Sequence, residues 1–148
     1  MARYLLVAHQ TAQRPELLEA ARDLAAADAH AEFTLLVPAT PVFHRLVSEE
    51  GETKEVAQST ARSSTAWLER NGIRVIEAKV GDADPVLAIE DELLGGRRYG
   101  AIVVSTLPAG VSRWLRMDVM SRLRRQHPRL RLIHVIADMT PTPADEPL

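Results

Sequence analysis

The last quarter of the chain, from Tyr99 to Ala137, constrains the fold most strongly. An apolar run at 101–104 is followed by a loop of small residues, a segment with apolar residues at helical spacing over 111–123, and a second apolar run. A strand, a helix and a strand in this order form a βαβ crossover, which places the two strands parallel. The loop after the first of these strands lies where α/β proteins bind ligands.

The rest of the chain repeats this alternation. Apolar runs at 4–8 and 33–37 and an alternating pattern at 73–80 predict three further strands. Helical spacing predicts helices over 15–25, 53–70 and 85–94. Asn71 and Gly72 suit the end of the second helix, and Asp84 suits the start of the third. We therefore predict a three-layer, doubly wound, Rossmann-like α/β fold with a five-stranded parallel sheet in the order 3-2-1-4-5.

Composition agrees with one globular domain, which we assign to residues 1–139, followed by a flexible tail at 140–148. The net charge of -2 gives no general attraction to nucleic acid or to a membrane, and we predict neither as a partner. The absence of cysteine excludes disulfides and thiolate catalysis, and no histidine spacing indicates a metal site. The apolar start is too short for a signal peptide or membrane helix, so we expect a cytoplasmic protein.

A candidate binding site follows from this topology, because the crevice of a doubly wound sheet lies beside the carboxyl end of the first strand. Hydroxyl groups, a cation and a helix start meet there, which favours phosphate or another anion. The alternative is a purely structural role, in which Gly110 and Ser112 only turn the chain and cap a helix. The candidate ligand-binding residues are Ala8, His9, Val37, Ser105, Thr106, Gly110, Ser112 and Arg113. A weaker hypothesis is a small-molecule enzyme that uses His9 with Ser105 or Thr106, although we assign no catalytic residue.

Other polar residues have structural interpretations. Asp82 and Asp84 are expected to form a turn and a helix cap, and His134 is expected to be a partnered structural histidine at a sheet edge or subunit contact. Seven arginines make the fourth helix and its exit basic, with Trp114 on the apolar face. We expect the basic face to be solvated or paired with an acidic patch such as 90–92. The arginines are Arg113, Arg116, Arg122, Arg124, Arg125, Arg129 and Arg131.

The chain resembles the universal stress protein family from Arg3 to Ala137. The resemblance is carried by the Tyr-Leu-Leu-Val-Ala start at 4–8, by Val-Gly-Asp at 80–82, and above all by the block from Ile102 to Val135. It implies the adenine nucleotide alpha hydrolase-like variant of the α/β fold and a homodimer joined along the last strand, from Leu130 to Ala137. It also implies a sensing or interaction module that has no demanding catalysis.

Many family members bind ATP through Gly, two residues, Gly, nine residues, then Gly with Ser or Thr. Aligned on Ser112, these positions hold Val104, Leu107, Met117 and Asp118, so every glycine is absent. Side chains there obstruct the approach of backbone N–H groups to phosphates. A carboxylate about 4 Å from a phosphate costs on the order of 4 kcal/mol at an effective dielectric of 20. We expect weak or no ATP binding; the alternative is ATP, AMP or a small anion in a redrawn site.

Overall fold

The computed structural model describes residues 2–41 and 50–138, with the backbone alone at 50–52. Its elements alternate as the apolar pattern predicts. The strands are β1 (Arg3–Val7), β2 (Glu32–Pro38), β3 (Val75–Gly81), β4 (Ala101–Thr106) and β5 (Leu132–Ile136). The helices are α1 (Pro15–Ala27), α2 (Glu50–Arg70), α3 (Pro85–Leu94), α4 (Arg113–Arg116) and α5 (Val119–Gln126). The tail predicted at 140–148 and most of the loop predicted at 38–52 lie outside the described residues.

The five strands form one parallel sheet in the order β3-β2-β1-β4-β5, which confirms the predicted fold and strand order. In the centre of the sheet, Leu6 of β1 lies opposite Leu35 of β2 and Val103 of β4. Each of these side chains is fully buried. Strands covered on both faces become continuous apolar runs, which is why periodicity alone identified them.

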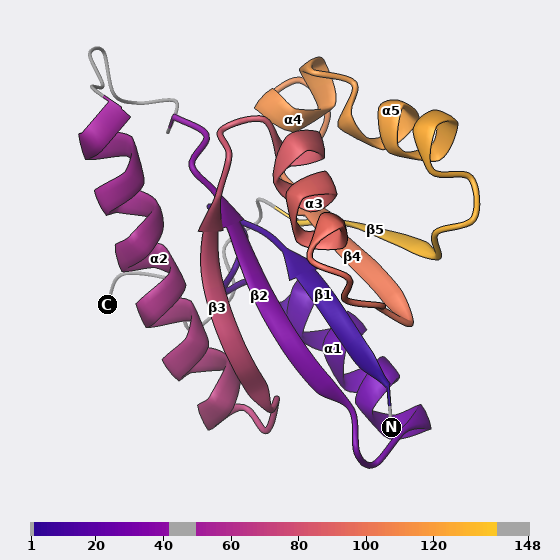
Figure 1. The fold of residues 1–148 in the computed structure, drawn as a ribbon. Coiled ribbons are helices and arrows are strands. Elements are labelled where there is room, and N and C mark those ends of the chain that lie inside the picture. Colours follow the sequence, from indigo (N-terminus) through magenta and orange to yellow (C-terminus); the bar gives the residue numbers. More distant parts are fainter. Residues whose placement is uncertain (1, 42–49, 139–148) are drawn as a thin grey trace.

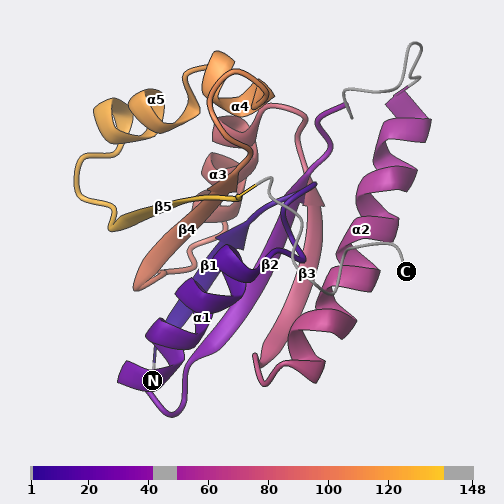
Figure 2. The same cartoon turned by 180° about the vertical axis from the view of Figure 1, so that it is seen from behind.

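Two helical layers cover the sheet, and alternate residues of each central strand face opposite layers. Helices α1 and α2 pack on one face, and α3, α4 and α5 pack on the other (Figures 1 and 2). Leu6 belongs to the core under α1 and α2, whereas its neighbour Leu5 belongs to the core under α3, α4 and α5. None of the helices in the described part of the chain is long and apolar enough to cross a bilayer.

The prediction of a single fourth helix over 111–123 is wrong, because this segment forms two helices that meet at Asp118. Asp118 has φ 58, in the left-handed region, and no α-helix continues through such a residue. Aspartate is among the few residues other than glycine that adopt this conformation readily. The apolar spacing of Trp114 and Val119 is preserved on both sides of the break, so periodicity could not reveal it.

The ends of some helices and strands differ from the predicted ends, because hydrogen bonds within turns replace strand pairing there. The strand predicted from Ile73 begins at Val75, because the Ile73 N–H closes the end of α2 by donating to Leu68 O over 3.0 Å. Gly72, with φ 87, provides the predicted helix end. The predicted cap of α3 is also confirmed, because Asp84 Oδ1 accepts from the Val86 N–H over 3.0 Å. Asp82 forms the turn before it, accepting from the Asp84 N–H over 2.9 Å.

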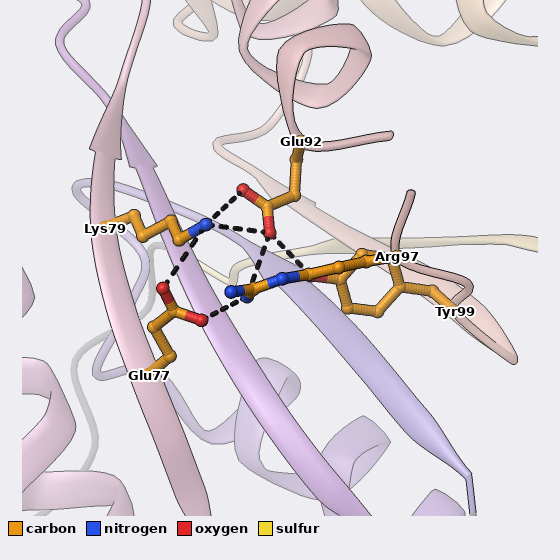
Figure 3. Close-up of polar contacts among 5 residues, drawn as sticks. All are labelled: Glu77, Lys79, Glu92, Arg97 and Tyr99. Carbon is orange, nitrogen blue, oxygen red and sulfur yellow. Dashed lines mark hydrogen bonds and ion pairs between the residues drawn. The ribbon is translucent and has the colours of Figure 1, made fainter. Parts of the chain in front are cut away.

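A charged cluster of Glu77, Lys79, Glu92, Arg97 and Tyr99 stands over the β2–β3 side of the sheet, next to α3 (Figure 3). It exists because the β2–β3 register shifts between Phe33 and Thr34, so that β3 carries one extra residue there. Glu92 is the buried member. Its carboxylate accepts from Lys79 Nζ over 3.0 Å and from the Tyr99 hydroxyl over 2.7 Å. Arg97 pairs with both glutamates and thereby ties the segment before β4 to β3.

The basic fourth segment is partly paired with acidic residues. Arg122 of α5 donates to both carboxylate oxygens of Asp84, over 3.3 and 2.8 Å, and His127 lies 3.5 Å from Glu90. Burial would raise the pKa of Asp84, but the hydrogen bonds from Arg122 and from the Val86 N–H leave that pKa below its usual value. The acidic patch therefore contributes through Glu90, whereas Glu92 belongs to the charged cluster.

Candidate ligand cavity at the ends of β1 and β4

A small cavity lies beyond the carboxyl ends of β1 and β4, as predicted for a doubly wound sheet. The volume open to the centre of a water molecule is ≈ 40 Å³. The described residues that line it are His9, Gln10, Thr11, Thr40, Pro41, Ser105, Thr106, Leu107, Ser112, Arg113 and Trp114. We call this the β1–β4 cavity.

His9 is the least satisfied polar group of the β1–β4 cavity. It is only 7% exposed, and neither Nδ1 nor Nε2 has a hydrogen-bond partner among the described residues. Burial lowers the pKa of His9 by more than the contact with its own backbone raises it, so the ring is neutral near pH 7. A neutral imidazole offers one N–H donor and one acceptor. Buried polar groups are nearly always paired in native proteins, so this ring is suited to a bound ligand.

The hydroxyl groups of the cavity are already held in place. Thr11 Oγ1 and Ser105 Oγ lie 2.6 Å apart and tie the loop after β1 to the end of β4. Thr106 Oγ1 lies 2.9 Å from His134 Nε2 of β5. Ser112 caps α4 by accepting from the Leu115 N–H over 3.1 Å. Each hydroxyl keeps unused hydrogen-bonding capacity, so fixed polar groups surround the cavity.

A tryptophan and a threonine close the side of the cavity toward β2 and β3. Trp114 Nε1–H donates to Thr40 Oγ1 over 3.0 Å, and the Thr40 hydroxyl donates to the Ala83 carbonyl over 2.6 Å. Trp114 and Thr40 are both buried. The two bonds connect α4, the end of β2 and the turn before α3, which are distant in the sequence.

The charge of the lining is positive. Arg113, at the start of α4, is exposed and makes no ion pair with any described residue, and no aspartate or glutamate is among the described residues around the cavity. The lining therefore offers a guanidinium, an imidazole and several hydroxyls without a competing carboxylate. Such a donor set suits an anion.

Five of the eight predicted site residues come together in the β1–β4 cavity, and three do not. Ala8 and Val37 are fully buried in the core under α1 and α2. Gly110 is exposed outside the cavity, where its φ of 93 turns the loop before α4. The residues that line the cavity as predicted are His9, Ser105, Thr106, Ser112 and Arg113.

Sequence reasoning missed the wall formed by Thr40 and Trp114 and the contribution of Thr11. Trp114 was assigned to the apolar face of a helix, and it does pack against the core under α3, α4 and α5. Its indole N–H, however, reaches Thr40, 74 residues earlier in the chain. A buried tryptophan needs a partner for that N–H, and this requirement is the only signal the sequence offered.

The four positions aligned with the ATP motif lie in different surroundings. Val104 is fully buried in the sheet, and Leu107 lines the β1–β4 cavity. Met117 packs against the core under α3, α4 and α5, and Asp118 is exposed. Leu107 is the only one of the four among the described lining residues. Obstruction of this cavity therefore comes from Leu107, and Asp118 does not face it.

The arrangement does not connect His9 with either hydroxyl named for an enzyme mechanism. Ser105 bonds to Thr11, and Thr106 bonds to His134. The Thr106–His134 pair is a hydroxyl and an imidazole within reach, but burial and the positive charge of Arg124 lower the pKa of His134. Both effects disfavour the imidazolium that a general base must become. Among the described residues, no group of three or more His, Asp or Glu side chains suits a metal ion.

Comparison of the whole fold with solved structures gives matches that extend over nearly the full chain. One is a universal stress protein in complex with cAMP, with a TM-score of 0.51 and 16% identity, covering 94% of this chain and 98% of that one. The fold is that of the universal stress proteins. A second match, a universal stress protein family protein from Arabidopsis thaliana with AMP bound, has a TM-score of 0.51 and 12% identity, covering 99% and 100% of the chains.

The resemblance to the universal stress proteins predicted from the sequence is thus confirmed at the level of the fold. No protein-family model matches the chain, and no curated protein is similar to it in sequence. At 12–16% identity, a shared fold does not show that two proteins bind the same ligand.

Proposed function

We propose that this chain is a non-catalytic sensing module with the universal stress protein fold, which binds a small oxyanion of phosphate size in the β1–β4 cavity. Adenine nucleotides bind weakly or not at all in this proposal. The observation that carries it is His9, whose two ring nitrogens are buried without a partner among the described residues beside that cavity. Leaving such groups unpaired costs about 1–3 kcal/mol, and a bound ligand recovers this free energy.

The class of ligand follows from charge and size. Arg113 supplies a positive charge, His9 supplies a donor, and no carboxylate is among the described lining residues. An open volume of ≈ 40 Å³ suits a tetrahedral oxyanion. Pockets for drug-sized ligands, by contrast, have about 300–1,000 Å³. The structural neighbours with cAMP and AMP bound make adenine nucleotides the first competitors to test.

Replacing Arg113 tests this proposal. We expect Arg113→Ala to weaken binding of inorganic phosphate about 10- to 100-fold in titration calorimetry, because a charge-assisted hydrogen bond contributes about 1.5–3 kcal/mol. Arg116→Ala is the matched control, since Arg116 is an exposed arginine of the same short helix but does not line the cavity. It should change the affinity less than twofold.

The same titrations should include ATP, AMP and cAMP. Affinity for phosphate in the wild-type protein, lost in Arg113→Ala and kept in Arg116→Ala, supports the proposal. If phosphate does not bind, or if both variants lose it equally, the anion site is not at this cavity. A nucleotide that binds at low micromolar concentration contradicts the expected weak nucleotide binding.

We also propose that the protein is a homodimer joined along β5, within the segment from Leu130 to Ala137. β5 lies at the edge of the sheet, and Ile136 is 50% exposed there. A groove of ≈ 560 Å³ runs between β5 and α1, lined partly by Ile133, Val135 and Ile136. An unpaired edge strand with aliphatic side chains is a natural partner for a second copy. β5 also contacts the cavity through the His134–Thr106 bond, which would connect the dimer edge to the ligand site.

A lysine at this edge should separate the subunits. We expect Ile136→Lys to convert a dimer into a monomer in light scattering coupled to size exclusion, because a charge would be buried in the interface. Ile76→Lys is the matched control, because Ile76 is an aliphatic residue, 38% exposed, on the opposite edge strand β3. A wild-type monomer, or dissociation caused by both variants, would refute the β5 interface.

A further inference from the structure

A much larger hollow lies near the β1–β4 cavity, on the side of Thr40 and Pro41. That second hollow has ≈ 790 Å³ open to the centre of a water molecule and lies between β3, α2 and α3. Pro41 lines both spaces. Ala83, whose carbonyl accepts from Thr40, lines the large hollow, and Trp114 lines the small cavity. The two spaces are therefore neighbours across Thr40, Pro41 and Ala83, and Trp114 packs on the side of Thr40 that faces the small cavity.

The wall is firmly built. Trp114 is 6% exposed and Thr40 is 6% exposed. The Thr40 hydroxyl uses its hydrogen toward Ala83 and a lone pair toward the indole N–H, so both groups are satisfied without a ligand. Breaking this chain in a buried setting costs about 1–3 kcal/mol for each group left unpaired.

Helix α4 itself is held at both ends, so the ring cannot move away easily. Its start is capped by Ser112, and it stops before Asp118, whose left-handed conformation begins the turn to α5. Trp114 lies within this short turn, and its indole N–H is bound to Thr40.

We propose that Trp114 is the specificity-determining residue of the β1–β4 cavity: its indole, held by Thr40, excludes the nucleoside part of a nucleotide and leaves room only for the oxyanion. The inference rests on the proposed anion site. If the phosphate of a nucleotide bound to His9 and Arg113, its nucleoside would extend either into solvent, where it gains no contacts, or against Trp114. With the indole removed, the cavity gains the volume of the ring on the side of Thr40, toward the ≈ 790 Å³ hollow. A pocket enlarged in this way falls nearer to the size that binds larger ligands.

The test measures phosphate and AMP affinity by titration calorimetry in three variants. Trp114→Ala removes the indole. Trp114→Leu keeps an apolar side chain on α4 but removes the N–H donor and most of the ring. Thr40→Val removes both hydrogen bonds of Thr40 and keeps the shape of its side chain. Trp67→Leu is the control, because Trp67 is the other tryptophan and packs on α2 against the opposite core.

We expect Trp114→Ala and Trp114→Leu to bind AMP at least tenfold more tightly than the wild type, and Thr40→Val severalfold more tightly. The ratio of AMP affinity to phosphate affinity should rise in all three variants, and Trp67→Leu should change neither affinity. Circular dichroism identifies any variant that does not fold; Trp114→Leu and Thr40→Val then decide the outcome. Unchanged AMP affinity in folded variants that still bind phosphate would overturn the role of Trp114. If the wild type fails to bind phosphate, the proposed function fails instead.

Discussion

Replacing His9 with leucine should raise the free energy of unfolding by about 1–3 kcal/mol at pH 7.5 in the absence of ligand. The wild-type ring buries two nitrogens that have no partner among the described residues, and an apolar side chain of similar volume removes that desolvation penalty. The same variant should lose phosphate binding by more than tenfold, because the cavity loses its imidazole donor. More stability with less binding is the pattern expected of a residue kept for function.

The stabilisation should also depend on pH. Burial lowers the pKa of His9 in the folded protein below its unfolded value of about 6.5. Below pH 6.5 the unfolded chain therefore binds a proton that the folded chain does not, so wild-type stability falls as the pH falls toward the folded pKa. The variant lacks this loss, and its advantage over the wild type should be larger at pH 5.5 than at pH 7.5. His134, whose pKa is also lowered, is present in both proteins and cancels in the comparison.

Urea denaturation at pH 5.5, 6.5 and 7.5 measures the effect. His30→Leu is the matched control, because His30 is exposed in the turn before β2. Its free energy of unfolding should stay within about 0.5 kcal/mol of the wild type. A His9→Leu protein that is less stable than the wild type at every pH would mean that the imidazole makes stabilising contacts within the protein. That result would contradict a His9 ring that is free to bind a ligand.

Replacing Glu92 with glutamine should destabilise the protein by about 2–3 kcal/mol. The Glu92 carboxylate is buried and accepts hydrogen bonds from Lys79, Arg97 and Tyr99 (Figure 3). Removing one partner of a fully buried ion pair costs about 3–5 kcal/mol. The expected value is lower, because the side chains of Lys79 and Arg97 remain 33% and 31% exposed and can turn toward water.

Thermal and urea unfolding measure this loss against Asp91→Asn, which neutralises an exposed neighbour on the same helix and should change stability by less than about 0.5 kcal/mol. The charged cluster should also weaken in acid. Hydrogen bonding to Arg97 keeps the pKa of Glu77 below its usual value, so the stability that Glu77 contributes is present above pH 4.5 and lost as the pH falls through the folded pKa. Equal effects of the two variants would show that the cluster is only a solvated surface.

The predicted and observed folds agree where local pattern carries the information. Three of the five strands, β1, β2 and β4, have buried cores that appear as apolar runs. Asp84 and Gly72 mark helix ends through their own conformational preferences. The split between α4 and α5 was missed, because Asp118 can adopt either a helical or a left-handed conformation. The turn is selected by the packing of Trp114 and Val119 onto one core, which is a tertiary effect.

The candidate site divides in the same way. His9, Ser105 and Ser112 were predicted, because topology alone brings the carboxyl ends of β1 and β4 together. The Trp114–Thr40 wall and the Thr106–His134 pair were not, since each joins residues 28 or more positions apart through side-chain geometry. The charged cluster depends on one extra residue in β3, which places Glu77 and Lys79 toward α3. Weak nucleotide binding, the homodimer and a cytoplasmic location stay predictions.

By itself, the sequence determined the alternation of strands and helices, the order of the sheet and the edge at which a ligand could bind. These features follow from burial periodicity and from the handedness of βαβ crossovers, both of which are properties of short segments. Only the tertiary structure decided the size and charge of the site. It left His9 without a partner among the described residues, lined the cavity with Trp114 and kept Asp118 out of the described lining. These outcomes depend on which distant side chains come within hydrogen-bonding distance of one another.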